Sequence, residues 1–194
     1  MQSEQIPEPW ASFLSQVDRR LNEDVELHCF GGFVITTLYG LARSTVDVDV
    51  LPAIRRSAWR RLADLAGKGS ELHRKYGAYL DFVTVATVPE DYDQRLTEMF
   101  PGAFRRLRLL AFDPYDLALA KLERNIQRDR DDVKFLARTI PFDLEILKDR
   151  YLKELRPLLG NPDREDLTLR LWVEAIEEDR GAAMEPRASN LTGD

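Results

Sequence analysis

Apolar residues recur along this chain at two spacings, one typical of helices and one typical of strands. Residues 7–22 have the helical spacing and predict an amphipathic helix, while the apolar run at residues 25–30 predicts a buried strand. A second helix is expected directly after Gly31 and Gly32. Residues 46–51 alternate strictly, which predicts a strand with Val46, Val48 and Val50 facing the core.

The second half of the chain continues this mixture of elements. A helix is expected at residues 57–66, a strand at 79–85, a short polar helix at 89–95 and a strand at 105–112. Asp113 followed by Pro114 is typical of a helix N-cap and first helical position, so a helix should begin there. Two further amphipathic helices are expected at 142–159 and 163–180, the second with these residues inward: Leu167, Leu171, Trp172 and Ile176.

This order of elements predicts an α/β fold, or α+β in terms of layers. We expect a small mixed sheet covered by helices, with a C-terminal helical segment. The predicted organisation is one domain at residues 1–140, including the N-terminal helix, a helical segment at 141–180 and a disordered tail at 181–194.

Two aspartates on the strand at residues 46–51 are the first sign of chemistry. Asp47 and Asp49 are one residue apart, so both side chains leave the strand on the same face. Two neighbouring carboxylates repel each other unless a positive charge lies between them. Oxygen ligands suit Mg²⁺ or Mn²⁺ rather than zinc, so the pair predicts a site for one of these ions.

The glycine pair before the second helix is the other half of the predicted site. Gly31 and Gly32 would leave backbone N–H groups at the helix start free to receive an anionic phosphate. A phosphate cradle joined by one helix to a metal-binding carboxylate pair is typical of a nucleoside triphosphate site.

These residues carry a resemblance to a known superfamily. Gly31-Gly32, a helix, then Arg43-Ser44-Thr45 and Asp47 with Asp49 resemble the motif of the DNA polymerase β-like nucleotidyltransferases. Among them, the chain is most similar to the minimal bacterial enzymes of the AbiEii and MenT toxin type, over roughly residues 25–137. The resemblance implies a third carboxylate on a later strand, and a triphosphate held by the glycine turn with Arg43, Ser44 and Lys121.

Asp81 fits the third carboxylate of that triad. It lies inside the apolar strand expected at residues 79–85, where an unpaired acid is unfavourable unless it binds a metal. In the implied mechanism Asp81 completes the metal site and activates the acceptor hydroxyl. The alternative is an acid on an edge strand that faces water.

The segment after Asp113 carries the second group of charged residues. Lys121, Arg124 and Arg128 are three and four residues apart, so a continuous helix would present them on one face. This segment resembles the second half of AbiEii-like enzymes, in which the lysine contacts the nucleotide phosphates; Asp129 or Asp132 would then orient the lysine or cap the following helix. Taken alone, the pattern favours a salt-bridged surface helix. Combined with the acidic triad, it favours a role in phosphate binding.

Composition limits the other classes of function. A single cysteine, Cys29, excludes a disulfide framework and a cysteine-based zinc site. The first residues lack the features of a signal peptide, and no apolar run has the length of a membrane span, so we expect a cytoplasmic protein without a membrane partner. The net charge of −6 disfavours a polyanion-binding protein in general, although Arg105, Arg106 and Arg108 form a local basic cluster.

The expected function is metal-dependent nucleotidyl transfer from an NTP to an acceptor hydroxyl. The resemblance implies a tRNA 3′ end or a protein as acceptor, a toxin role and a cognate antitoxin as partner. Two alternatives remain. One is a catalytically silent, antitoxin-like binding module with this fold, and the other is a small-molecule nucleotidyltransferase of the aminoglycoside type.

Overall fold

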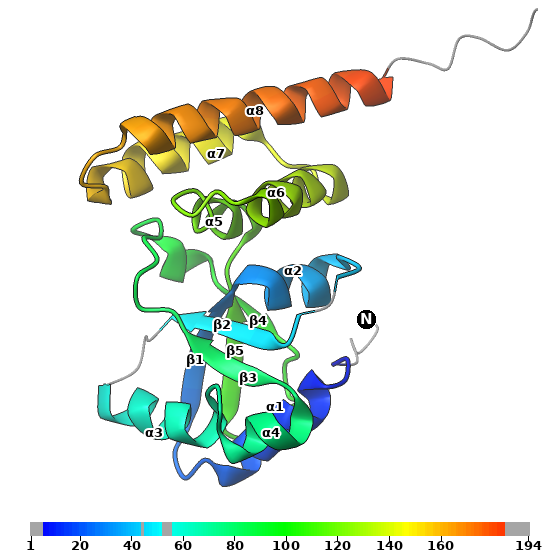
Figure 1. Cartoon of the computed structure of the whole chain (residues 1–194), viewed down its shortest axis with the longest axis vertical. Coiled ribbons are helices and arrows are strands. Elements are labelled where there is room, and N and C mark those ends of the chain that lie inside the picture. The colour runs from blue at the N-terminus through cyan, green and yellow to red at the C-terminus, as the bar shows by residue number, and fades with distance from the viewer. Residues whose placement is uncertain (1–5, 44, 52–55, 185–194) are drawn as a thin grey trace, which may run out of the picture.

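A five-stranded mixed sheet forms the centre of the protein in the computed structural model, which describes residues 6–43, 45–51 and 56–184 (Figure 1). The strand order is β3-β2-β1-β5-β4. β1 pairs antiparallel with β2 and parallel with β5, β2 pairs parallel with β3, and β4 pairs antiparallel with β5. The strands are β1 (Val25–Phe30), β2 (Asp47–Leu51), β3 (Tyr79–Phe82), β4 (Thr97–Met99) and β5 (Leu107–Ala111).

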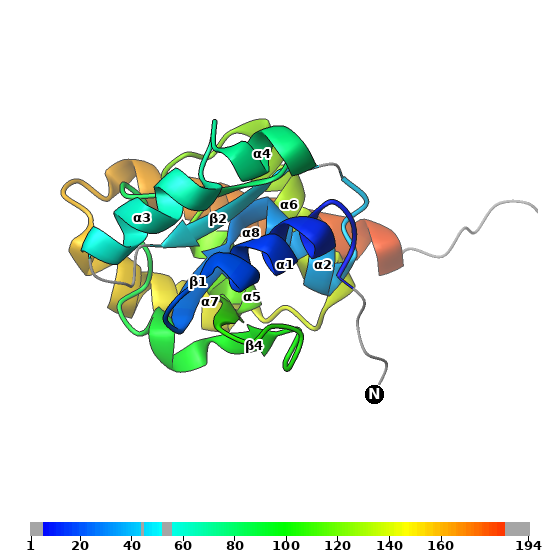
Figure 2. The same ribbon diagram turned by 90° about the horizontal axis from the view of Figure 1, so that it is seen from below.

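Helices lie on both sides of this sheet. Figure 1 shows α1, α3 and α4 below it and the C-terminal helices stacked above it, and Figure 2 shows the first group from below. The helices are α1 (Trp10–Arg20), α2 (Gly31–Tyr39), α3 (Arg56–Ala66), α4 (Glu71–Tyr76), α5 (Pro114–Leu119), α6 (Gln127–Thr139), α7 (Leu144–Arg150) and α8 (Asp163–Met184). Shorter turns occupy Tyr92–Arg95, Tyr151–Leu155 and Arg156–Leu158.

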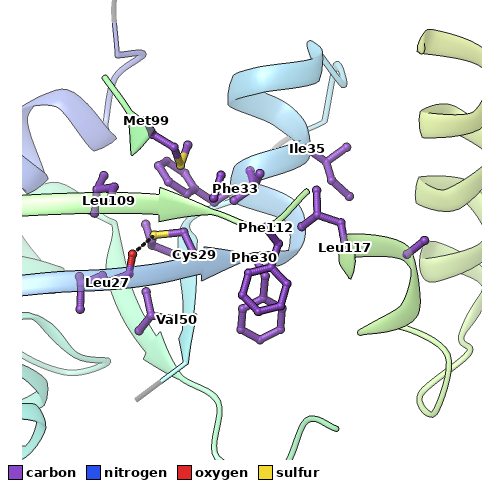
Figure 3. Close-up of a cluster of buried hydrophobic side chains, with 14 of the residues drawn as sticks. Leu27, Cys29, Phe30, Phe33, Ile35, Val50, Met99, Leu109, Phe112 and Leu117 are labelled. Carbon is purple, nitrogen blue, oxygen red and sulfur yellow. Dashed lines mark hydrogen bonds between the residues drawn. The ribbon is translucent and has the colours of Figure 1, made fainter. Parts of the chain in front are cut away.

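The core is centred on β1, because this strand is the middle one of the five in the sheet. Figure 3 shows Leu27 and Cys29 of β1 between Val50 and Leu109 of the neighbouring strands. At the end of β1, Phe30 stacks on Phe112 with 5.4 Å between the ring centroids. The same cluster of buried residues extends to α5 and α6, so one core joins the sheet to the first C-terminal helices.

The predicted α/β fold with a small mixed sheet is confirmed, as is the helix that Asp113 caps. The Asp113 carboxylate accepts hydrogen bonds from the N–H groups of Tyr115 and Asp116 at 3.0 and 2.9 Å. The sequence pattern missed β4 and α4, which are three and six residues long. Segments this short give too few positions to establish a period.

Three predicted orientations are wrong. Val48 and Val50 are fully buried as expected, but Val46 precedes β2 and is 44% exposed. On α8, Trp172 and Ile176 are buried, whereas Leu167 and Leu171 are 45% and 51% exposed. α8 packs on one side only, so its apolar stripe is wider than the surface that covers it.

The continuous helix expected through Lys121, Arg124 and Arg128 is also wrong. α5 ends at Leu119, and α6 begins at Gln127. Asn125 lies between the two helices and has a φ of 44°, in the left-handed region, so α5 and α6 cannot form one continuous helix. At the other end of the chain, α8 continues to Met184, beyond the predicted end at residue 180.

In the described ranges, no helix combines the length and the apolar character needed to cross a membrane.

Candidate active site

Three aspartates meet at one end of the strand pair β2 and β3. Asp47 and Asp49 lie on the same face of β2, and Asp49 is in register with Asp81 of β3. One carboxylate oxygen from each of the three lies within 4.8 Å of the others. None of the three carboxylates forms an ion pair within 4.0 Å with any side chain in the described part of the chain. The cluster is therefore an unneutralised concentration of negative charge.

This arrangement changes the pKa of the Asp49 carboxylate. Burial, followed by the charges of Asp47 and Asp81, raises the pKa of Asp49 to about 6. Lys121 and Arg124 act in the opposite direction without cancelling that shift. A cation bound among the three carboxylates would remove the repulsion, because it favours the ionised form of each.

The start of α2 approaches Asp49 so closely that only glycine fits. A Cβ atom on Gly31 would lie 1.9 Å from Asp49 Oδ2, and the residue has a φ of +70°. Gly31 therefore satisfies two requirements at once, the left-handed backbone and the contact with the carboxylate. The N-cap residue of α2 is Phe30, which forms no side-chain capping bond, so the N–H groups of the first turn are available to an anion.

Cations surround the second glycine. A Cβ on Gly32 would lie 3.1 Å from Arg43 Nη2 and 3.5 Å from Arg128 Nη2. Arg43 Nη2 in turn donates to Asp132 Oδ2 at 3.1 Å, which fixes the guanidinium beside the helix start. A phosphate at the N-terminus of α2 would thus meet both backbone N–H groups and guanidinium groups.

Lys121 is held between two fully buried aspartates of α6. Its ammonium lies 2.8 Å from Asp132 Oδ2 and 3.4 Å from Asp129 Oδ1. Asp129 also accepts hydrogen bonds from Arg124, at 2.9 and 2.6 Å, and from the N–H of Ile126 at 3.2 Å. Burial raises the pKa of Asp129, but the Arg124 hydrogen bond and the Lys121 charge outweigh it, so the net pKa is lowered. Three cations share two aspartates, and the network keeps an excess of positive charge.

A cleft of about 240 Å³ lies beside Asp49 and Lys121. Its polar side is formed by Gly31, Asp49, Lys121, Glu123 and Arg124. Its other side is mainly apolar and is formed by Phe30, Val83, Val85, Ala86 and Ala120. The cleft therefore places two carboxylates, two cations and an apolar wall within reach of one ligand.

Most of the residues predicted for the site meet here, although they come from separate elements. Ser44 lies outside the described residues. Asp81 joins the triad, but β3 is an edge strand and Asp81 is exposed, so the expectation of an acid within a buried strand is wrong. Asp129 has both of the roles considered for it, since it pairs with Lys121 and caps the start of α6.

Thr45 is a residue of this site that the prediction did not include. Its buried hydroxyl donates to Asp47 Oδ1, and it lies beside Gly32. The sequence does carry a signal for it, because Thr45 and Asp47 are two residues apart and share a face of extended backbone. The bond orients one carboxylate of the triad.

Comparison with known proteins gives a family. The model of the family described as "nucleotidyltransferase of unknown function (DUF6036)" matches residues 11–180. The chain belongs to this family. Comparisons with curated proteins and with solved structures found no match. The match to this nucleotidyltransferase family includes the triad, the glycines, the Lys121 network and most of α8.

Proposed function

We propose that this nucleotidyltransferase transfers a nucleoside monophosphate from an NTP to an acceptor hydroxyl, with a divalent cation held by Asp47, Asp49 and Asp81. The observation that carries the proposal is the triad itself, three carboxylates whose oxygens approach within 4.8 Å beside a helix start and a cationic network. The donor set is oxygen only, which fits Mg²⁺ or Mn²⁺. When bound, such an ion would neutralise charge on the reacting phosphate and polarise it.

The chain's own cations would bind the triphosphate. Arg43 lies beside Gly32 in the first turn of α2, and Lys121 and Arg124 line the cleft together with Gly31. Lys121 and Arg124 are oriented by Asp129, so their positions are fixed before substrate arrives. Ser44 would join this group, as the resemblance implies.

Asp81 would act as the general base. Its exposure on an edge strand leaves it accessible to an acceptor approaching from solvent. The acceptor oxygen forms a bond to the α-phosphorus and its proton passes to Asp81, while the bond between the α-phosphorus and the bridging oxygen breaks and pyrophosphate leaves. The apolar wall of the cleft, with Phe30 and Val83, would receive the nucleobase.

The acceptor and the biological role are proposed on the resemblance to AbiEii and MenT enzymes. That resemblance favours a tRNA 3′ end or a protein side chain, a toxin function and an antitoxin partner. A small-molecule acceptor is the alternative for an enzyme with this site. A silent, antitoxin-like module is disfavoured by the triad, because repulsion among three unpaired carboxylates destabilises a protein that gains nothing from them.

The test is transfer of label from each α-labelled NTP with Mg²⁺ and total bacterial RNA, with protein and RNA resolved on one gel. We expect label on RNA or on protein, and a loss of at least about 100-fold in Asp47→Asn, since the isosteric amide removes a ligand charge. Asp64→Asn, an exposed acid on α3, is the matched control and should transfer normally.

Other outcomes separate the alternatives. NTP binding without transfer to either polymer would point to a small-molecule acceptor. Absence of NTP binding in the presence of Mg²⁺, or equal activity in Asp47→Asn and the control, would contradict the proposal.

A further inference from the structure

A second cavity, of about 330 Å³, lies between α6 and α8. Figure 1 shows α6 between α2 on one side and α8 on the other, so α6 separates the active-site residues from this cavity. The floor of the cavity is formed by buried Val133, Trp172 and Ile176, and Leu171 lies at its exposed edge. The volume is within the range of small-molecule sites.

Asn125 organises one wall of the cavity. Its Oδ1 accepts hydrogen bonds from Trp172 Nε1 and from Arg130 Nε, both at 3.0 Å. Its Nδ2 donates to Thr168 Oγ1 at 3.3 Å. Helix α6, helix α8 and the turn between α5 and α6 are therefore joined around one amide, and the wall is formed without a ligand.

The cations that line the cavity, Arg130 and Lys134, form no close ion pair with an acid in the described ranges. Arg130 and Lys134 are one turn apart on α6 and line the same cavity, an arrangement that is unfavourable between like charges. Across the described ranges, neither forms an ion pair with a carboxylate within 4.0 Å, whereas Arg138 on the same helix pairs with Asp179. Of the nearby acids, Asp131 accepts a hydrogen bond from Gln127. Asp179 is already paired with Arg138, and the Arg138 hydrogen bond and, to a smaller extent, the Lys134 charge lower its pKa. An anion between Arg130 and Lys134 would relieve the repulsion.

The cavity is also continuous in sequence with the active site. Arg124 lines the cleft beside the triad, and the next residue, Asn125, lines this cavity. A ligand that reaches across the turn between α5 and α6 could therefore contact both sites.

We propose that this cavity binds a nucleoside monophosphate unit. Its phosphate would lie between Arg130 and Lys134, and its base would pack against the apolar surface of Leu171 and Trp172. The proposal deepens the proposed function and rests on it, because the unit is either the end of an RNA acceptor or a free nucleotide that acts on the enzyme. Both sources present the same chemistry to the cavity.

The test follows Trp172 by ¹⁹F NMR in full-length protein labelled with 5-fluorotryptophan. The chain has three tryptophans, and loss of a signal in Trp172→Phe identifies the relevant one. The probes are the four nucleoside 5′-monophosphates and a short single-stranded RNA, both in EDTA. We expect a saturable shift of the Trp172 signal, with the signals of Trp10 and Trp59 unchanged.

Two variants and one control test the assignment. Lys134→Ala should weaken binding by about tenfold through loss of a charge-assisted contact. Ala175→Leu should weaken it by filling the cavity, and Lys153→Ala, an exposed lysine that pairs with Asp149, should have no effect.

Saturation at lower concentration by the RNA would identify an acceptor end, and saturation at lower concentration by the mononucleotide would identify a free nucleotide; both support the site. A Trp172 signal that millimolar probe leaves unshifted, or a shift that persists unchanged in Lys134→Ala and Ala175→Leu, would overturn it. Because the experiment contains neither divalent metal nor NTP, its failure leaves the proposed transfer reaction standing.

Discussion

At the scale of a single residue, Asp49 shows that the site lowers the stability of the folded protein. Its carboxylate lies against Gly31 and near two further carboxylates, and burial together with these charges raises its pKa from 3.8 to about 6. Above pH 6 the folded protein must hold this group charged, while the unfolded chain does so with little penalty. The free energy of unfolding is therefore lowered by this residue above pH 6, and the penalty disappears as the pH falls toward 4.

Asp49→Asn should consequently stabilise the metal-free protein while abolishing transfer. The expected gain is about 2 kcal/mol at pH 8, somewhat below the value for a full two-unit shift because the substituted amide would still be a buried polar group. The gain should decline between pH 6 and pH 4. Urea denaturation in EDTA at pH 8 and pH 5 measures it, and an equal gain at both pH values would refute the electrostatic origin.

At the scale of an element, α2 depends on the geometry of its two ends. It begins at Gly31 and its C-cap is Gly40, and these glycines have φ values of +70° and +75°. Their surroundings differ. A Cβ on Gly31 would overlap Asp49, while a Cβ on Gly40 would meet no described atom within 4 Å.

Gly31 and Gly40 give a matched test of the contact between Gly31 and the Asp49 carboxylate. Gly31→Ala and Gly40→Ala should both lower the free energy of unfolding, by roughly 1–2 kcal/mol from the left-handed backbone alone. Only Gly31→Ala should also displace the Asp49 carboxylate and reduce transfer by at least about 100-fold. Denaturation and label transfer are measured on both proteins, and similar activity in the two would show that the contact at Gly31 has no catalytic importance.

At the scale of the whole molecule, buried ion pairs join the sheet side to the C-terminal helices. Arg95 donates to the fully buried Asp116 of α5 at 2.9 and 3.0 Å and to Glu154, after α7, at 2.6 and 3.2 Å. Arg150 of α7 lies 2.6 Å from Asp113 and 3.3 Å from Asp116. These contacts fix α5, and with it the turn that carries Lys121, relative to α7.

Arg95→Met should therefore destabilise the protein by about 3 kcal/mol, because it leaves Asp116 buried with a single remaining arginine partner. Arg108→Met is the control, since Arg108 also pairs with two acids, Glu26 and Glu98, but on the surface. The control should change stability little. Urea denaturation of both variants gives the comparison, and equal losses would mean that burial of the network is unimportant.

Several features of this protein depend only on the local order of residues, and the sequence was sufficient to predict them. Alternation at residues 46–51 set Asp47 and Asp49 on one face of a strand, and the Asp113-Pro114 pair set the start of α5. The glycine pair likewise marked the start of α2. Each of these features follows from backbone geometry over a few residues, so a pattern within the chain was sufficient to predict it.

The contacts between residues far apart in the sequence depend on how the chain folds. The position of β3 at the sheet edge exposed Asp81, and the left-handed Asn125 separated Lys121 from α6 and placed it between Asp129 and Asp132. Strand order and the path of a turn depend on packing between segments far apart in sequence, and no local period records them. The order of residues thus predicted that Asp47 and Asp49 share a face of one strand. The fold brought Asp81 and the cations close to them.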